Sequence, residues 1–377
     1  RTAVYKPKQF STYLNRVTNF LNEGIVANGN VKVIAENQTF RFDYYLGESE
    51  ADTGAFKGME AIANLGLPEP KLPNQTDGEN NLPELDPLNF PEGPLLFLTD
   101  VADWKITTTF DSTTLAKASG AINLTENLAR VNAGEMDWTM AGLTHDDMYC
   151  TLGTFSWNLK TSYFKCEAAR LTMPGREKFP IWGIFEFHST RHRTPEDSEY
   201  PRFQSYLKNN QFFELGDGVD IVGGITQKGR VLSTANYFNS YSVFSFKPGG
   251  KKAFQLLSPE FQISDSLVNS NYSLVQIFNK NDTLYHPGVV LDYQVNKRLL
   301  RMSTEVKSLK ETPFFDTYHK FEITCDDIYY YLDSNKVEFR IRNAPALVPA
   351  VFQSTDYYNA DIIKALKGYK NYDPLVL

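Results

Sequence analysis

The chain has 377 residues and a formal net charge of −7, with 38 Lys and Arg against 45 Asp and Glu. Because 42% of its residues are hydrophobic and 22% are charged, it can bury a core, which excludes a wholly disordered chain. No window approaches about 18 consecutive apolar residues, so the sequence predicts no membrane span. The 27 Phe and 21 Tyr favour sheets, because flat rings pack well on pleated surfaces.

The first 22 residues are basic and carry a helical pattern. Arg1, Lys6, Lys8 and Arg16 are accompanied by no acidic residue. Because the chain starts with Arg, we expect a processed product whose basic segment is the root of a longer arm that neutralises nucleic-acid phosphates. An ordinary basic terminus is the alternative. The apolar residues recur at helical spacing and predict a helix of about three turns: Phe10, Tyr13, Leu14, Val17, Phe20 and Leu21.

Residues 46–100 are acidic and rich in proline. They hold eleven Asp and Glu against two Lys, and seven prolines fall between Pro68 and Pro94. Proline cannot donate a hydrogen bond to a strand ladder, and like charges repel one another. We therefore expect a long insertion at the surface, either a solvated linker or a recognition surface.

Most of the remaining chain shows the alternation of apolar and polar residues that strands require. Strands are expected over 31–35, 40–44, 104–110, 163–171, 181–188, 241–246, 289–295, 300–306, 328–332 and 337–341. A short helix is expected over Asn123–Arg130, and an amphipathic one over Tyr357–Lys367. Many short antiparallel strands without a βαβ rhythm predict an all-β sandwich or barrel, with short helices near both termini.

No metal site, cofactor site or disulfide framework is predicted. His188 and His192 have the spacing of a metal pair on a helix, but the residues before them alternate as a strand does. The three cysteines are odd in number and widely spaced, which disfavours both paired disulfides and a structural zinc site: Cys150, Cys166 and Cys325.

Two acidic pairs are the candidates for acid–base catalysis. His145-Asp146-Asp147 and Cys325-Asp326-Asp327 each bring carboxylates together, as glycosidases and metal hydrolases require. Both are also common turn compositions. The chain contains no nucleophile elbow, Walker loop or dinucleotide fingerprint. No catalytic residue is therefore predicted, and the chain is not expected to be an enzyme.

Residues 163–187 resemble part of a known viral family. The run Tyr163-Phe164-Lys165-Cys166-Glu167-Ala168-Ala169-Arg170-Leu171-Thr172-Met173-Pro174, a polar turn and then Trp182-Gly183-Ile184-Phe185-Glu186-Phe187 are similar to the central strand pair of single jelly-roll icosahedral capsid proteins. In the capsid proteins of nodaviruses and of the diatom-infecting bacilladnaviruses, a strand likewise ends in a Pro-containing turn and the next strand begins near a Gly. The likeness covers about 25 residues, and the rest of the chain matches in layout only.

The resemblance implies a jelly-roll capsid subunit that self-assembles into an icosahedral shell in the virion. Residues 1–30 would form a basic arm and helix, 31–345 a jelly-roll sandwich with the insertion at 46–100, and 346–377 a tail with an amphipathic helix. Partners would be copies of itself and a viral nucleic acid, which Arg1, Lys6, Lys8 and Arg16 would face. No cleavage site is carried over from the family.

Two other classes of protein fit the same composition. The first is a secreted carbohydrate-binding or glycoside-hydrolysing β-sandwich, in which exposed aromatics would stack on sugars and an acidic pair would act as acid and base. The second is a cell-surface adhesin or receptor ectodomain, which needs no catalytic pair.

Overall fold

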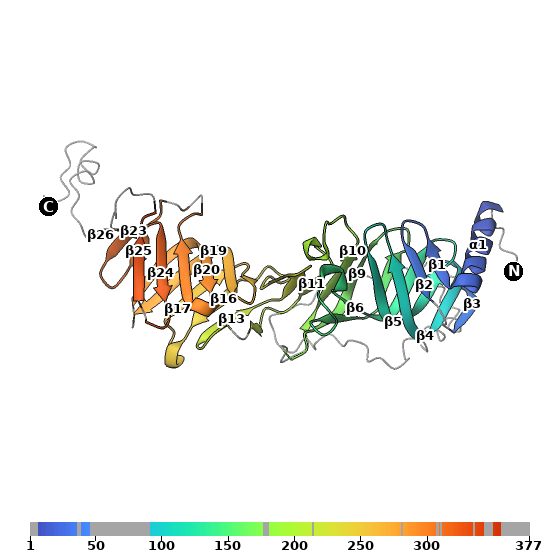
Figure 1. Ribbon diagram of the computed structural model, residues 1–377, viewed down its shortest axis with the longest axis horizontal. Coiled ribbons are helices and arrows are strands. Elements are labelled where there is room, and N and C mark those ends of the chain that lie inside the picture. The colour runs from blue at the N-terminus through green and yellow to red at the C-terminus, as the bar shows by residue number, and fades with distance from the viewer. Residues whose placement is uncertain are drawn as a thin grey trace, which may run out of the picture. The chain divides into compact units, whose positions relative to one another are not determined.

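The structure is a computed structural model that describes residues 7–35, 39–45, 91–175, 181–212, 215–279, 282–306, 309, 311–334, 336–342 and 350–355. The chain divides into two compact units (Figure 1). The first holds the described residues up to Asn210 together with Gly223–Ser240, and the second holds Gln211–Val222 and those from Tyr241 onward. The range 31–345, expected as one sandwich, is thus divided between two units.

Several predicted features fall outside the described residues. These are Arg1 and Lys6, residues 46–90 of the acidic insertion, and the helix expected over Tyr357–Lys367. Residues 93–100, the end of the expected insertion, belong to strand β4 (Gly93–Thr107). This end of the predicted insertion is therefore a paired strand rather than a surface loop.

The first unit begins with a helix, α1 (Pro7–Glu23), that lies beside β1 (Ile25–Asn28) and β3 (Phe40–Tyr45) (Figure 1). The helix contains all six apolar residues of the expected face. It ends where Gly24 adopts a φ of +65°, and the Gly24 N–H donates to Phe20 O at 2.8 Å. Glycine is the residue that takes this left-handed conformation without a steric cost, so it ends the helix cleanly.

The strands of the first unit pair antiparallel with partners close in chain order. The pairs are β1–β2, β2–β4, β3–β4, β4–β5, β5–β6, β6–β7, β6–β8, β7–β9, β9–β10, β10–β11, β11–β14 and β14–β15. The bounds not yet given are β2 (Lys32–Ala35), β5 (Ser112–Asn123), β6 (Leu128–Asp137), β7 (Tyr149–Leu152), β8 (Phe155–Asn158), β9 (Tyr163–Thr172), β10 (Ile181–His188), β11 (Arg202–Ser205), β14 (Thr226–Lys228) and β15 (Val231–Ser233).

The sheet of the first unit curls around its own core. Trp138, directly after β6, makes an edge contact with Phe185 of β10 at a centroid distance of 5.7 Å. Those strands are three steps apart in the ladder, a separation of about 14 Å in a flat sheet. Trp138 Nε1 also donates to Pro201 O at 2.9 Å. The inner face of the curled sheet therefore encloses the aromatic core.

Strand β12 (Asn210–Phe212) crosses the boundary between the units, and the second unit is built from the other strands, again with antiparallel pairs. Its bounds are β13 (Val219–Gly223), β16 (Ser242–Phe246), β17 (Phe254–Ser258), β18 (Gln262–Ile263), β19 (Leu267–Asn279), β20 (Asp282–Gln294), β21 (Leu299–Ser303), β22 (Phe314–Asp316), β23 (Phe321–Thr324), β24 (Asp327–Tyr331), β25 (Lys336–Arg340) and β26 (Val351–Ser354). The main ladder runs β13–β16–β17–β19–β20–β21–β24–β25, and the first half of β20 also starts the branch β22–β23–β26.

This second sheet closes over a core as well. Phe254 of β17 and Tyr330 of β24 lie four steps apart in the ladder, yet their ring centroids are 5.4 Å apart. In a flat sheet the same strands would be separated by about 19 Å. Each unit thus has a core of its own, enclosed by its own strands.

Three hairpins predicted from alternation are confirmed. They are β9–β10, β20–β21 and β24–β25. Gly183 in β10 is required for packing, because a Cβ there would lie 2.1 Å from the backbone oxygen of Gln204.

The helix expected over Asn123–Arg130 is wrong, because β5 ends and β6 begins within it. Asn123 Oδ1 accepts the N–H groups of Thr125 and Glu126, at 3.0 and 3.1 Å, and so builds a tight turn. Asparagine favours such turns over a helix because its short side chain binds the nearby backbone.

The all-β, antiparallel class is confirmed. Among the described strands, paired partners have at most two other strands between them in chain order. This order is that of a meander, in which local hairpins supply most of the pairs.

Candidate functional site

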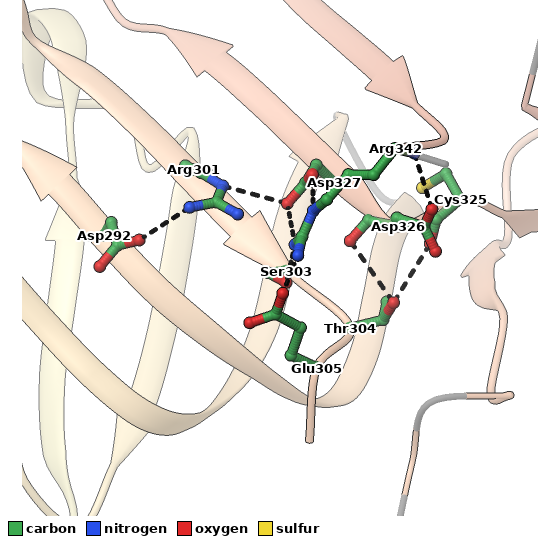
Figure 2. A network of polar contacts seen from close by, with 9 residues as sticks. All are labelled: Asp292, Arg301, Ser303, Thr304, Glu305, Cys325, Asp326, Asp327 and Arg342. Atoms are coloured by element: carbon green, nitrogen blue, oxygen red, sulfur yellow. Dashed lines mark hydrogen bonds and ion pairs between the residues drawn. The ribbon is translucent and has the colours of Figure 1, made fainter. Parts of the chain in front are cut away.

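A buried carboxylate held by two arginines is the densest polar network among the described residues of the second unit (Figure 2). Asp327 Oδ1 accepts from Arg301 Nε at 3.1 Å and from Arg342 Nη2 at 2.6 Å. Its second oxygen, Oδ2, accepts from Arg342 Nε. The Asp327 side chain is 1% exposed, so its charge is balanced by guanidinium groups rather than by water.

The network extends to neighbouring strands. Arg301 Nη1 reaches Asp292 of β20 at 3.3 Å, and Arg342 contacts Ser303 and Glu305. Arg342 comes two residues after the end of β25, so these contacts fasten the chain leaving β25 to the β20–β21–β24 ladder.

The adjacent Asp326 binds backbone groups, whereas Asp327 binds arginine side chains. Its carboxylate accepts the backbone N–H of Arg342 at 2.8 Å, and its backbone oxygen accepts the N–H of Thr304 at 3.0 Å. Burial raises the pKa of Asp327, with the nearby Arg301 opposing the shift. A carboxylate occupied by two arginines cannot also activate water, so this predicted acidic pair forms a structural contact.

The second acidic pair, in His145-Asp146-Asp147, is also used locally. Asp147 Oδ2 accepts from the backbone N–H and the hydroxyl of Thr144, both at 2.8 Å. His145 stacks on Tyr149 with centroids 4.1 Å apart, and its Nε2 lies 3.8 Å from Glu135 Oε2. These contacts shape the turn before β7 rather than aim two carboxylates at a common point.

A third polar cluster, in the first unit, was missed by sequence reasoning. The Ser189 hydroxyl donates to Asp111 Oδ2, Thr108 Oγ1 lies 2.6 Å from Ser189 Oγ, and His192 Nε2 lies 3.5 Å from Asp111 Oδ1. The carboxylate stands between serine and histidine, so the imidazole is not placed to take the serine proton. The residues are about 80 positions apart, which left no local signal in the sequence.

Of the four predicted basic residues, the structure describes Lys8 and Arg16, and their surroundings differ. Lys8 is exposed on α1, whereas Arg16 is half-buried and its Nη1 donates to Leu124 O. Burial lowers the pKa of Arg16, and the nearby Glu126 carboxylate opposes that shift. Arg16 is therefore part of the contact between α1 and the β5–β6 turn.

The predicted apolar face of α1 is largely exposed. Of its apolar residues, Phe20 alone is fully buried, and it packs edge-on against Phe40 and Phe42 of β3 at 5.0 and 6.4 Å. The exposed apolar side chains of α1 and β3, between 36% and 57% exposed, are here called the α1–β3 surface: Phe10, Leu14, Leu21, Phe40, Phe42 and Tyr44.

Strand β3 contributes to this surface an edge that no other described strand covers. Among the described strands it pairs with β4 alone, through the register Phe40↔Leu98 to Tyr45↔Gly93. Its aromatic residues Phe40, Phe42 and Tyr44 alternate with Arg41 and Asp43. An unpaired strand edge with exposed aromatics is a template for pairing with another chain.

The described residues hold no group of three or more His, Cys, Asp and Glu placed to bind a metal ion. Within the same part of the chain, no helix is long and apolar enough to cross a membrane. All three cysteines are buried and free. Comparisons of the chain with protein-family models, with curated proteins and with solved structures find no match.

Proposed function

We propose that this protein is a structural protein that acts by associating with copies of itself, and that it is not an enzyme. The observation that carries the proposal is the α1–β3 surface, which combines an apolar helix face with a strand edge that no other described strand covers. Exposed apolar side chains gathered on neighbouring elements are typical of an interaction site. The contacts of Asp147, Asp326 and Asp327 support a non-catalytic role.

The occupant of the surface is a second copy, because β3 is complementary to itself. If two β3 strands pair antiparallel about Phe42, Arg41 of each copy lies opposite Asp43 of the other. The aromatic residues then meet on the other face, with Phe40 opposite Tyr44 and Phe42 opposite Phe42. Opposite charges and aromatic pairs across strands each contribute about 0.2–1 kcal/mol.

Side-chain burial alone would give weak association. Burying the half-exposed side chains of the α1–β3 surface contributes about 1 kcal/mol each. Association costs about 4–15 kcal/mol in lost freedom of motion. Pairing of the β3 backbone is therefore needed for a stable contact, and several such contacts per copy are needed for a large assembly.

An icosahedral capsid subunit is the specific form of this proposal that the sequence favours. It is supported by the likeness of residues 163–187 to capsid strand pairs, by the β9–β10 hairpin found there, and by the basic residues near the N-terminus. A jelly-roll order and a virion location remain predictions. The jelly-roll order requires pairs between strands far apart in the chain, whereas the described pairs are local.

The first test compares Phe10→Glu with Phe110→Glu. Both side chains are 49% exposed in the first unit, but only Phe10 lies on the α1–β3 surface. Light scattering after size exclusion should show association in the wild type and in F110E, and its loss in F10E. A wild-type protein that is monomeric at every concentration would contradict the proposal.

The second test reverses charges on β3. R41D or D43R alone should weaken association about tenfold, because like charges would face each other, and the double variant R41D/D43R should restore it. If all three variants associate like the wild type, the contact does not use β3, and residues 46–90 or another surface must account for it.

The capsid form needs its own test. Electron microscopy of the purified protein should show closed shells, and Lys6→Glu with Lys8→Glu should reduce the nucleic acid that co-purifies. Association without shells would leave a structural protein of another kind.

A further inference from the structure

An open pocket of ≈590 Å³ lies beside α1 in the first unit. One wall is the helix face that carries Thr12, Asn15, Arg16 and Asn19, which follow the i, i+3, i+4, i+7 spacing. The others are β1 with the turn after it, Asn127 of the β5–β6 turn, and the turn residues at Leu159–Lys160. This pocket is separate from the α1–β3 surface, whose residues do not line it.

The lining is unusually rich in side-chain amides. Asparagine accounts for 28 of the 377 residues, so about one would be expected among the 13 that line the pocket. Five occur there: Asn15, Asn19, Asn28, Asn30 and Asn127. None of these amide side chains hydrogen-bonds to another described residue. Each offers both a donor and an acceptor, which is the pattern that a ligand hydroxyl group satisfies.

The pocket is also positively charged in a chain that is negative overall. Arg16 and Lys160 line it, and no Asp or Glu does. Arg16 is fixed by its bond to Leu124 O, with Glu126 outside the lining as its acidic neighbour. Lys160 is exposed and has no ion-pair partner among the described residues. A guanidinium held by a backbone hydrogen bond and an exposed ammonium in the same pocket suit an anionic group on a ligand.

We propose that this pocket binds a saccharide that carries an acidic group. The hydroxyl groups bind the asparagine amides, and the acidic group binds Arg16 and Lys160. A single-stranded nucleic acid fits less well, because bases stack on aromatic side chains and the lining holds none. The inference does not depend on self-association.

The test measures binding to the full chain by isothermal titration calorimetry with three probes. These are a tetrasaccharide of galacturonic acid, the neutral tetrasaccharide maltotetraose and a single-stranded oligonucleotide. The acidic saccharide should bind at least tenfold more tightly than the neutral one, and added salt should weaken it.

Three variants locate the site. Asn19→Ala and Lys160→Gln should each weaken binding of the acidic saccharide at least fivefold. Asn22→Ala, an exposed asparagine of α1 outside the pocket, should leave it unchanged. Equal binding of the neutral saccharide, tighter binding of the oligonucleotide, binding unaffected by N19A and K160Q, or no binding by any probe would each overturn the proposal.

Discussion

At the scale of single residues, His286 is buried with both ring nitrogens occupied. Nε2 lies 3.0 Å from Thr312 O, and Nδ1 accepts the N–H of Gly288 at 3.0 Å. The neutral ring with its proton on Nε2 satisfies both contacts. A second proton on Nδ1 would face an N–H donor. Burial lowers the pKa of His286 below its ordinary value of 6.5.

This arrangement predicts a pH-dependent stability. Below about pH 6.5 the unfolded chain takes up a proton at His286 that the folded chain does not bind, so the free energy of unfolding falls as pH falls. Between the pKa of the folded state and 6.5, the free energy of unfolding changes by up to about 1.4 kcal/mol per pH unit. Urea unfolding, followed by far-UV circular dichroism at pH 7.5 and at pH 5.5, measures the difference in the free energy of unfolding. His286→Gln should reduce the difference between the two pH values, and an unreduced difference would contradict the assignment.

At the scale of secondary-structure elements, the Asp327 network fastens β20, β21 and β24 to the chain leaving β25. Removing one charged member of a buried ion network leaves the other charges buried without a counter-charge. Asp333 offers a matched comparison, because it also binds an arginine, Arg298, at 2.6 Å, but its side chain is 71% exposed.

Asp327→Asn should therefore destabilise the second unit by about 3 kcal/mol. Asp333→Asn should cost about 0.5 kcal/mol, because water screens an exposed pair. Both values follow from urea unfolding at neutral pH. Equal losses in the two variants would show that Asp327 is not a buried anchor.

The elements that sequence reasoning predicted well are the hairpins whose residues alternate over a whole strand. β24–β25 is an example, because Asp333 and Ser334 mark the turn and one face of each strand is apolar. The helix predicted over Asn123–Arg130 is wrong, because the Asn123 side chain accepts nearby backbone N–H groups and builds a turn instead. The exposure of α1 could not be predicted either, since an amphipathic pattern does not show whether a partner for its apolar face is in the same chain.

The candidate sites could not be predicted from the sequence either. The contacts of Asp327 join residues from four separate segments, and the Asp111 cluster joins residues about 80 positions apart. Such contacts depend on which strands pair and in which register: Asp292 lies opposite Arg301, for example, and Ser303 lies opposite Asp327. The amide-lined pocket is likewise assembled from four segments, none of which has a distinctive composition alone.

At the scale of the whole molecule, the chain has two units with separate cores. All four tryptophans lie in the first unit: Trp104, Trp138, Trp157 and Trp182. Tryptophan fluorescence therefore reports on the first unit, whereas far-UV circular dichroism reports on the strands of both. The chain enters the second unit at Gln211, returns at Gly223 and leaves again after Ser240, so no single linker in the sequence marks the boundary.

Phe254→Ala should separate the two signals. Phe254 is fully buried in the second core against Phe244, Phe246 and Tyr330, and its truncation should cost about 3–5 kcal/mol. The part of the circular dichroism change that comes from the second unit should occur at a lower urea concentration. The urea midpoint of the tryptophan fluorescence change should stay the same. Equal movement of both transitions would show that the units unfold as one.

The three free cysteines have a practical consequence. Burial raises the pKa of Cys166 and of Cys325 to about 12 and raises that of Cys150 as well, so the native thiols stay protonated and shielded. A cysteine introduced on the surface of each unit would then be the preferred target of a maleimide dye. Energy transfer between two such dyes could follow inter-unit distances in solution without first replacing the native cysteines.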